Sequence, residues 1–206
     1  MKEKGIRTRE RVLAGATEIF HRQGFSGTSI HDLIRETGVK KGNLYHYFSS
    51  KEEMGLQVLS RARDDFFRFL ENSLQGDRPS VQLANHFDAI VRYHESRNLV
   101  GGCIFGNTAL EMSDRNETYR DVIHSVFQEW RRRIRDVLES AVRSGEGRKD
   151  LDPEAMARHV VATVEGGILL ARASRNPADL KECLAVLAGL LGIGDETINR
   201  WGKQTG

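Results

Sequence analysis

The segment spanning residues 28–51 constrains the fold of this chain more than any other, because it has the pattern of two short helices joined by a tight turn. Ile30, Leu33 and Ile34 are spaced i, i+3 and i+4, so they line one face of the first helix. Gly38 predicts the end of that helix, since glycine readily adopts the positive φ found just beyond a helix C-terminus. The first half of the segment therefore indicates a helix that packs, followed by a turn.

The second half of the segment predicts a helix that keeps polar groups at the surface. Leu44 and Phe48 are spaced i, i+4 and would hold this helix against a core. A helix–turn–helix needs this layout, in which the second helix has polar side chains free to enter a major groove. The polar, basic and aromatic positions around the two anchors are Lys40, Lys41, Gly42, Asn43, Tyr45, His46 and Tyr47.

Charge is distributed unevenly along the chain. Residues 1–51 contain ten Lys and Arg against five Asp and Glu, whereas the remaining residues contain 21 against 24. A basic N-terminal part on an acidic body suits a protein whose one end meets a polyanion. Because the basic part coincides with the helix–turn–helix pattern, we expect double-stranded DNA as a partner.

Length and composition exclude several classes of protein. No apolar run among the 206 residues is long enough to cross a bilayer, and the first residues lack the hydrophobic segment of a secretory signal. We therefore expect a cytoplasmic protein without a membrane partner. Cys103 and Cys183 are far apart and lack metal-ligand spacing, so the sequence predicts no disulfide framework, no metal site and no cofactor.

Periodicity predicts an all-α fold of about nine helices, without strands or internal repeats. Helices are expected near residues 6–23, 51–74, 80–95, 104–112, 153–173 and 177–191, with two short helices in the 28–48 segment and a long one closed by Gly145. Capping patterns predict several starts: Ser29 with Asp32, Ser50 with Glu53, Asp114 with Glu117, Asp152-Pro153 and Asn176-Pro177.

Residues 7–54 resemble the N-terminal domain of TetR-family transcriptional regulators. The matching features are an Arg-rich start, then Phe20…Gly24-Phe25…Thr28-Ser29, then Gly38-Val39-x-Lys41-Gly42-x-Leu44-Tyr45-x-x-Phe48-x-x-Lys51. A weaker likeness, to the sixth helix of some of these regulators, covers residues 102–111. The chain departs from the family pattern at Ile34, where Ala is usual, and at Asn43, where Ser or Thr is usual.

The resemblance implies two domains with separate tasks. Residues 1–50 would form a three-helix, helix–turn–helix DNA-binding domain, and residues 51–206 a larger helical domain for ligand binding and dimerisation. A small apolar or aromatic molecule would shift the population toward a form that no longer fits the operator, so the protein would be a repressor. The helix at residues 51–74, which joins both domains, would be the lever.

Position in the motif indicates which residues would contact DNA. Lys41, Gly42, Asn43 and Tyr45 are nearest to the groove, and Asn can bond adenine bidentately. Lys51 is unfavourable at a helix N-terminus, which a bound phosphate would explain. Further expected contacts are Thr28 and Ser29 at the start of the first helix, Lys40 and His46. For each single residue, packing or simple solvation remains the alternative.

A homodimer is expected, because one DNA-reading helix contacts only a few base pairs and a second copy supplies the rest of the affinity. Two apolar stripes are the candidate interface. They lie on the helices at residues 153–173 and 177–191, and the resemblance implies that these helices form a four-helix interface. The alternative is that the stripes are intramolecular core. The expected interface residues are Val160, Val164, Ile168, Ala171, Leu184, Leu187 and Leu191.

Aromatic residues are frequent between residues 66 and 130, and they predict an apolar effector pocket with a few polar groups. Solid core is the alternative for each of them. The expected pocket residues are Phe66, Phe69, Phe87, Ile90, Tyr93, Phe105, Asn107, Ile123, Phe127, Trp130, Val164 and Glu165. His94 and His124 are further possible polar anchors.

Other functions find less support in the sequence. The seven histidines are scattered, and neither a catalytic signature nor a phosphate-cradling glycine loop is present, so we do not expect an enzyme. A helical dimer that binds partners or ligands without DNA remains an alternative, as does a transcriptional activator. Salt-dependent binding to DNA would separate the regulator from the first of these.

Overall fold

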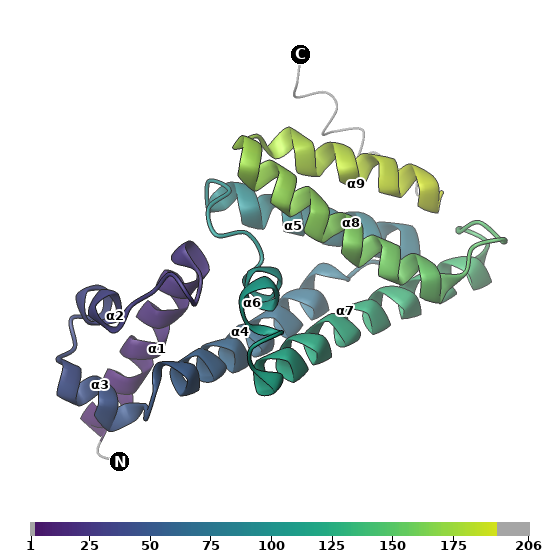
Figure 1. Ribbon diagram of the computed structural model, residues 1–206. Helices are drawn as coiled ribbons and strands as arrows, with labels where there is room; N and C mark the ends of the chain where they lie inside the picture. Colours follow the sequence, from purple (N-terminus) through teal and green to yellow (C-terminus); the bar gives the residue numbers. More distant parts are fainter. Residues whose placement is uncertain (1–2, 193–206) are drawn as a thin grey trace. The chain divides into compact units, whose positions relative to one another are not determined.

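The computed structural model describes residues 3–192, which form nine helices and contain no strand (Figure 1). The all-α expectation is therefore confirmed for this part of the chain. The helices are α1 Glu3–Gln23, α2 Ile30–Thr37, α3 Lys41–Tyr47, α4 Lys51–Ser73, α5 Pro79–Ser96, α6 Ile104–Met112, α7 Glu117–Ser144, α8 Pro153–Ser174 and α9 Pro177–Leu191. Within these residues, no helix combines the length and the apolar character needed to cross a bilayer.

The chain packs into two compact units, and neither is a continuous stretch of sequence. Unit 1 contains the described residues up to Asp65 together with Cys103–Ser125, and unit 2 contains Phe66–Gly102 together with the described residues from Val126 onward. Helices α4 and α7 each run from one unit into the other. The division into a DNA-binding domain of residues 1–50 and a second domain of residues 51–206 stays a prediction. The two compact units are defined by which residues pack together and have other boundaries.

Local chemistry explains the helix–turn–helix in unit 1. The Ser29 hydroxyl accepts the backbone N–H of Asp32 (3.1 Å), and the Asp32 carboxylate accepts the N–H of Ser29 (3.0 Å), so α2 begins with a complete capping box. Gly38, at φ 66°, ends the helix and donates its N–H to the Ile34 carbonyl (2.9 Å). The predicted positions of this cap and this turn are confirmed.

The core of unit 1 is built from the apolar faces of its helices. Leu33 of α2 and Leu44 of α3 are fully buried, as is Phe48, which directly follows α3. Phe25, in the turn between α1 and α2, is also buried. From α1 the buried apolar side chains are Val12, Leu13, Ala16, Ile19 and Phe20, and from α4 they are Met54, Val58 and Leu59.

Two predicted helix starts differ in the structure. The start of α7 is capped by Asn116, whose Oδ1 accepts the Tyr119 N–H (3.2 Å), and not by Asp114 as predicted. At α4, Ser50 Oγ does accept the Glu53 N–H (3.0 Å), but the Glu53 carboxylate accepts the N–H of Ser49 (2.6 Å), one residue before the predicted position. In addition, α1 begins at Glu3 and not near Ile6. At α7 the capping side chain is thus two residues after the predicted one, whereas at α4 the predicted Ser50 caps the helix and only the partner of the Glu53 carboxylate differs.

Unit 2 is built around one apolar cluster to which α4, α5, α7, α8 and α9 all contribute. Helices α8 and α9 pack along each other, and α5 packs against α9 (Figure 1). Asp152 and Asn176 each accept an N–H of the first turn (3.0 Å in both cases), and each is followed by proline. Both predicted starts are confirmed, and they position the two helices that carry the predicted dimer stripes.

Gly167 allows α8 and α9 to approach closely, and we expect Gly167→Ala to destabilise the protein. A Cβ at this position would lie 2.8 Å from Leu180 Cδ1 and 3.3 Å from Cys183 Cβ. At the neighbouring Gly166, a Cβ would meet nothing within 4 Å. Because alanine favours helix at both positions, Gly167→Ala should be less stable than Gly166→Ala by about 1–3 kcal/mol. Equal stabilities in urea unfolding would show that the contact is not tight.

Candidate nucleic-acid interface and effector site

Helix α3 presents a polar surface because its apolar side chains are all turned inward. Leu44 is 0% exposed and Phe48 1%, whereas Lys41, Gly42 and Asn43 are exposed. Tyr45 is 44% exposed, so it does not pack into the core of unit 1. The structure thus brings together at the surface the residues expected to be nearest the groove. Lys40, the residue before the helix, and His46 are exposed on the same short element.

The polar groups at the start of α2, where a phosphate contact is predicted, have partners within the chain. Thr28 is 1% exposed, and its hydroxyl donates to the Gly24 carbonyl (2.7 Å), so its role is structural. Ser29 donates both its N–H (3.0 Å) and its hydroxyl (2.6 Å) to the Asp32 carboxylate. These donors lower the pKa of Asp32, which therefore keeps a negative charge at this helix end. A phosphate would meet that charge. Thr28 and Ser29 therefore have packing and capping roles within the chain, and their contact with phosphate stays a prediction.

Lys51 also has a partner inside the chain. Its Nζ lies 4.3 Å from the centre of the Phe25 ring, a cation–π contact within unit 1. Burial lowers the pKa of Lys51. The position of a lysine at the start of α4 thus has an explanation within the chain, and a contact of Lys51 with phosphate stays a prediction.

Two residues distant in sequence hold the helix–turn–helix in unit 1, and sequence reasoning missed their roles. Glu111 of α6 accepts the backbone N–H of Ser26 (2.5 Å) in the turn between α1 and α2. Tyr119 of α7 is fully buried and donates its hydroxyl to the Glu52 carbonyl (2.8 Å). No local pattern could have indicated them, because each bond spans more than sixty residues.

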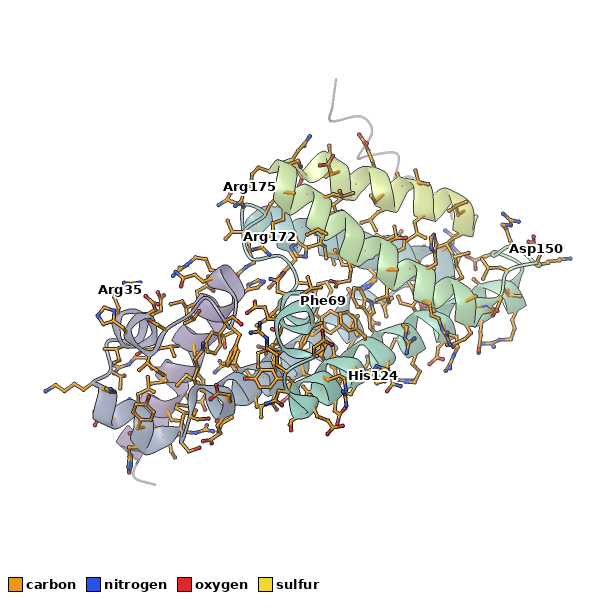
Figure 2. All side chains as sticks on the ribbon, in the orientation of Figure 1. Arg35, Phe69, His124, Asp150, Arg172 and Arg175 are labelled. Atoms are coloured by element: carbon orange, nitrogen blue, oxygen red, sulfur yellow. The ribbon has the colours of Figure 1, made fainter. Side chains whose placement is uncertain are left out.

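Several residues expected to form the effector pocket lie together in unit 2. Phe66 contacts Trp130 edge-on, with ring centres 5.1 Å apart, and stacks with Phe69 at 6.1 Å. Phe69 and Tyr93 are 6.3 Å apart, and Phe127 and Trp130 are 6.4 Å apart. Phe69 is labelled in Figure 2. The partly buried rings of this group are Phe66, Phe69 and Phe127, with Tyr93 more exposed.

Other expected pocket residues are core residues or belong elsewhere. Phe87, Ile90 and Val164 are buried in the apolar cluster of unit 2. Phe105, Asn107 and Ile123 belong to unit 1, so their membership of one site with the aromatic residues of unit 2 remains a prediction. The polar candidates differ: His94 is buried, Glu165 is half-buried, and His124, labelled in Figure 2, is exposed.

His86 is a fully buried polar residue at the aromatic cluster, and sequence reasoning did not select it. Trp130 Nε1 donates to His86 Nε2 (3.1 Å), so the proton of the neutral ring is on Nδ1, which donates to Ser73 Oγ (2.8 Å). These three residues come from α7, α5 and α4. Burial lowers the pKa of His86 to about 3. The ring is therefore neutral at physiological pH and fastens three helices together.

His86 makes the stability of the protein depend on pH. In the unfolded chain this residue titrates near 6.5, so between pH 6.5 and about 3 the unfolded state binds one more proton than the folded state. The free energy of unfolding should therefore fall by about 2 kcal/mol between pH 7.5 and pH 5.0 through this residue alone. Urea unfolding at both pH values should show this loss in the wild type and not in His86→Gln. His124→Gln, at an exposed position, is the control, and an undiminished loss in His86→Gln would exclude His86 as the cause.

The residues predicted to form the dimer interface face the core of unit 2 and not the surface. Val160, Val164, Ile168, Ala171, Leu184, Leu187 and Leu191 are all buried in the core of unit 2, with exposed fractions of 7% or less. The prediction of these residues as a free interface is therefore corrected in favour of intramolecular packing. The large apolar side chains that α8 and α9 leave exposed are Leu169, Leu170, Val186 and Leu190.

A surface hollow of about 370 Å³ lies where α7 and α8 are joined, and it is separate from the predicted pocket. Arg148 and Asp150, which form an ion pair (2.7 Å), flank an apolar floor. The other lining residues are Leu151, Asp152, Ala155, Met156, His159 and Leu190. In the described residues, no group of His, Cys, Asp and Glu is arranged to hold a metal ion.

Comparison with known proteins decides the family. Residues 12–58 match the family model described as bacterial regulatory proteins, tetR family, and residues 79–187 match that of the tetracyclin repressor-like C-terminal domain. The chain belongs to the TetR family. As a member, it is a helix–turn–helix transcriptional regulator, and the two matches cover both the DNA-reading helices and most of unit 2.

Individual relatives of this TetR-family regulator extend over nearly its whole length. A TetR transcriptional regulator from Chloroflexus aurantiacus J-10-fl is 34% identical, with a TM-score of 0.83 over 90% of this chain and 94% of that one. The transcriptional repressor DhaR from Mycobacterium sp. (strain GP1) is 28% identical and covers 93% of this chain and 96% of its own. The transcriptional repressor NemR from Escherichia coli K12 is 27% identical, covering 89% and 94%.

Proposed function

We propose that this TetR-family regulator is a cytoplasmic homodimeric repressor that binds operator DNA through α3 and is released when a small apolar or aromatic molecule binds its helical domain. The observation that carries the proposal is the surface of α3. Its apolar positions are buried, while Lys41, Gly42, Asn43 and Tyr45 are exposed on an unobstructed helix. Repression and not activation is favoured because DhaR and NemR are named as repressors.

The proposed DNA contacts are fewer than the sequence indicated. Thr28, Ser29 and Lys51 have partners inside the chain, so Lys40, Lys41, Gly42, Asn43, Tyr45 and His46 remain. Asn43 would read an adenine edge in the major groove, and Lys40 and Lys41 would bind phosphates. A Cβ at Gly42 would meet nothing within 4 Å, so packing within the chain does not require a glycine here. We propose that this glycine lets the backbone approach the DNA.

The proposed dimer uses the outer faces of α8 and α9. Leu169 and Val186 are 61% and 66% exposed, and Leu170 and Leu190 extend the apolar surface. A second copy would cover these side chains in an isologous interface, the usual arrangement of a two-fold dimer. The two α3 helices would then read two half-sites about one helical turn apart.

The proposed effector would bind at the partly buried rings of unit 2. Phe66, Phe69, Phe127 and Tyr93 supply an aromatic surface, and His86 beside them is neutral because its pKa is about 3. Such surroundings favour an uncharged ligand. Helix α4 contributes Phe66 and Phe69 and continues into unit 1, so it is the proposed lever.

Selection from fragmented genomic DNA, followed by sequencing and fluorescence anisotropy, tests this function. The full-length protein should enrich fragments with an inverted repeat. Its affinity for them should fall by about 10³–10⁵ between 50 and 200 mM salt, as expected for 6–10 phosphate contacts. Enrichment of no fragment, or binding insensitive to salt, would favour the alternative of a helical dimer that does not bind DNA.

A further inference from the structure

The connection between α5 and α6 contains the most unusual backbone of the described residues. The non-glycine residues with positive φ are Asn98 (52°), Leu99 (58°) and Arg175 (59°). The first two lie in this connection, which continues through Gly101 (91°) and Gly102 (69°). A left-handed conformation is unfavourable for any residue with a Cβ and most of all for a bulky one such as leucine. The surrounding structure must therefore hold Leu99 in place.

Two arginines at the end of α8 hold this connection, and we call Arg172 and Arg175 the α8 clasp. Arg175 Nη1 donates to the Leu99 carbonyl (3.1 Å), and Arg172 Nη1 donates to the Gly101 carbonyl (3.2 Å). Figure 2 labels both arginines at this end of α8. Arg175 is itself the third non-glycine residue with positive φ, as the C-cap of α8. The three non-glycine residues with positive φ among the described residues thus meet at one joint, made of residues 97–102 and the end of α8, where Arg175 donates to Leu99.

An ion pair from α9 also holds the end of α5, just before the connection. Lys181 pairs with Glu95, near the end of α5, with a distance of 2.8 Å and a lysine side chain only 17% exposed. Helices α8 and α9 therefore hold the end of α5 and the residues that follow it by three charged side chains. These are the helices whose outer faces we assign to the dimer.

The connection between α5 and α6 lies where the chain passes from unit 2 into unit 1. The chain passes between the two compact units after Asp65, after Gly102 and after Ser125. The first and third passages lie inside the continuous helices α4 and α7, whereas the second directly follows the strained connection. Beyond it, Cys103 caps α6, its Sγ accepting the Gly106 N–H (3.4 Å). Helix α6 in turn carries Glu111, whose carboxylate accepts the backbone N–H of Ser26 in the turn before α2.

We propose that residues 97–102 and the α8 clasp form a latch with two states, which sets the order of α6 and thereby couples helix α8 to the turn between α1 and α2. In the latched state the two arginines compensate the left-handed backbone of Asn98 and Leu99. Release of the arginines allows these residues to leave the left-handed region, and α6 loses its fixed start. Strained residues of this kind cluster at switch segments, because only an over-determined structure maintains them.

Hydrogen exchange on the full-length, DNA-free protein tests the latch. The double variant Arg172→Met/Arg175→Met keeps the unbranched apolar stem of both side chains and removes the guanidinium donors. Backbone amides of residues 104–112 and 24–29 should exchange about tenfold faster than in the wild type, while those in the middle of α8 and α9 remain unchanged. Arg158→Met is the matched control, because this exposed arginine of α8 pairs with Glu154.

Substitutions at Asn98 test the same latch without touching the arginines. Its side chain is exposed, so Asn98→Ala removes no packing but makes the left-handed backbone less favourable, whereas Asn98→Gly makes it more favourable. Exchange in residues 104–112 and 24–29 should therefore rise in Asn98→Ala and stay at or below the wild-type rate in Asn98→Gly. Faster exchange confined to residues 97–102, or equal effects of Ala and Gly, would overturn the proposal. No DNA is needed, so the result is independent of whether the protein proves to be a repressor.

Discussion

Replacing Leu169 and Val186 by glutamate is expected to convert the regulator from a dimer into a monomer and to weaken operator binding by more than about 100-fold. Both side chains are mostly exposed in the single chain, so the substitutions should leave its fold intact. In a two-fold interface each substitution occurs twice, which would place four carboxylates in an apolar contact without partners. Sedimentation velocity would measure the assembly, and fluorescence anisotropy the binding to a selected fragment.

Two control variants separate the dimer face from other effects of these substitutions. Leu110→Glu changes a leucine of α6 that is 87% exposed, and it should leave the dimer unaffected. Leu184→Ala changes a fully buried side chain of α9 and should lower the free energy of unfolding by about 2–5 kcal/mol. A dimer that survives both glutamates would refute the assignment of the interface to the outer faces of α8 and α9.

Asn43→Ala is expected to weaken binding to the selected operator by about 5- to 150-fold, because a bidentate Asn–adenine pair contributes about 1–3 kcal/mol of discrimination. The loss should be small on unrelated DNA, since the contact reads a base. Lys41→Ala should instead weaken binding to all sequences alike and reduce the slope of log K against log salt by about 1. Anisotropy titrations of both variants against operator and unrelated fragments, at several salt concentrations, measure these differences.

Asn72→Ala is the matched control for Asn43, because Asn72 is an exposed asparagine of α4 outside the helix–turn–helix. It should leave affinity and salt dependence unchanged. If Asn43→Ala lost affinity equally for operator and unrelated DNA, the side chain would bind phosphate and not a base.

The helix boundaries show which structural features local sequence can predict. Ser29 with Asp32, Gly38, Asp152-Pro153 and Asn176-Pro177 were located correctly, because each acts on backbone groups within a few residues. The start of α7 was misplaced because Asn116 and Asp114 are both good caps. Only the geometry of the preceding turn, where the Asn116 N–H bonds the Met112 carbonyl (2.9 Å), selects between them.

The site required information that no local pattern contains. The apolar stripe of α8 that includes Val160 and Val164 has the spacing of a buried face, but spacing does not say whether the same chain or a second copy covers it. The contact of Lys51 with Phe25 cannot be read from the sequence, because the two residues are 26 positions apart. His86 was overlooked for the same reason, since Trp130 lies 44 residues away.

By itself, the sequence determined that this protein is an all-α TetR-family regulator with a helix–turn–helix, and it predicted a surface helix that carries Lys41, Gly42, Asn43 and Tyr45. Those features depend on helical periodicity, caps and motif spacing, which act over a few residues. Only the tertiary structure decided which donors are already occupied, which faces of α8 and α9 remain free, and how Arg172 and Arg175 hold a left-handed connection. These depend on contacts between residues far apart in the chain, and folding alone brings them within bonding distance.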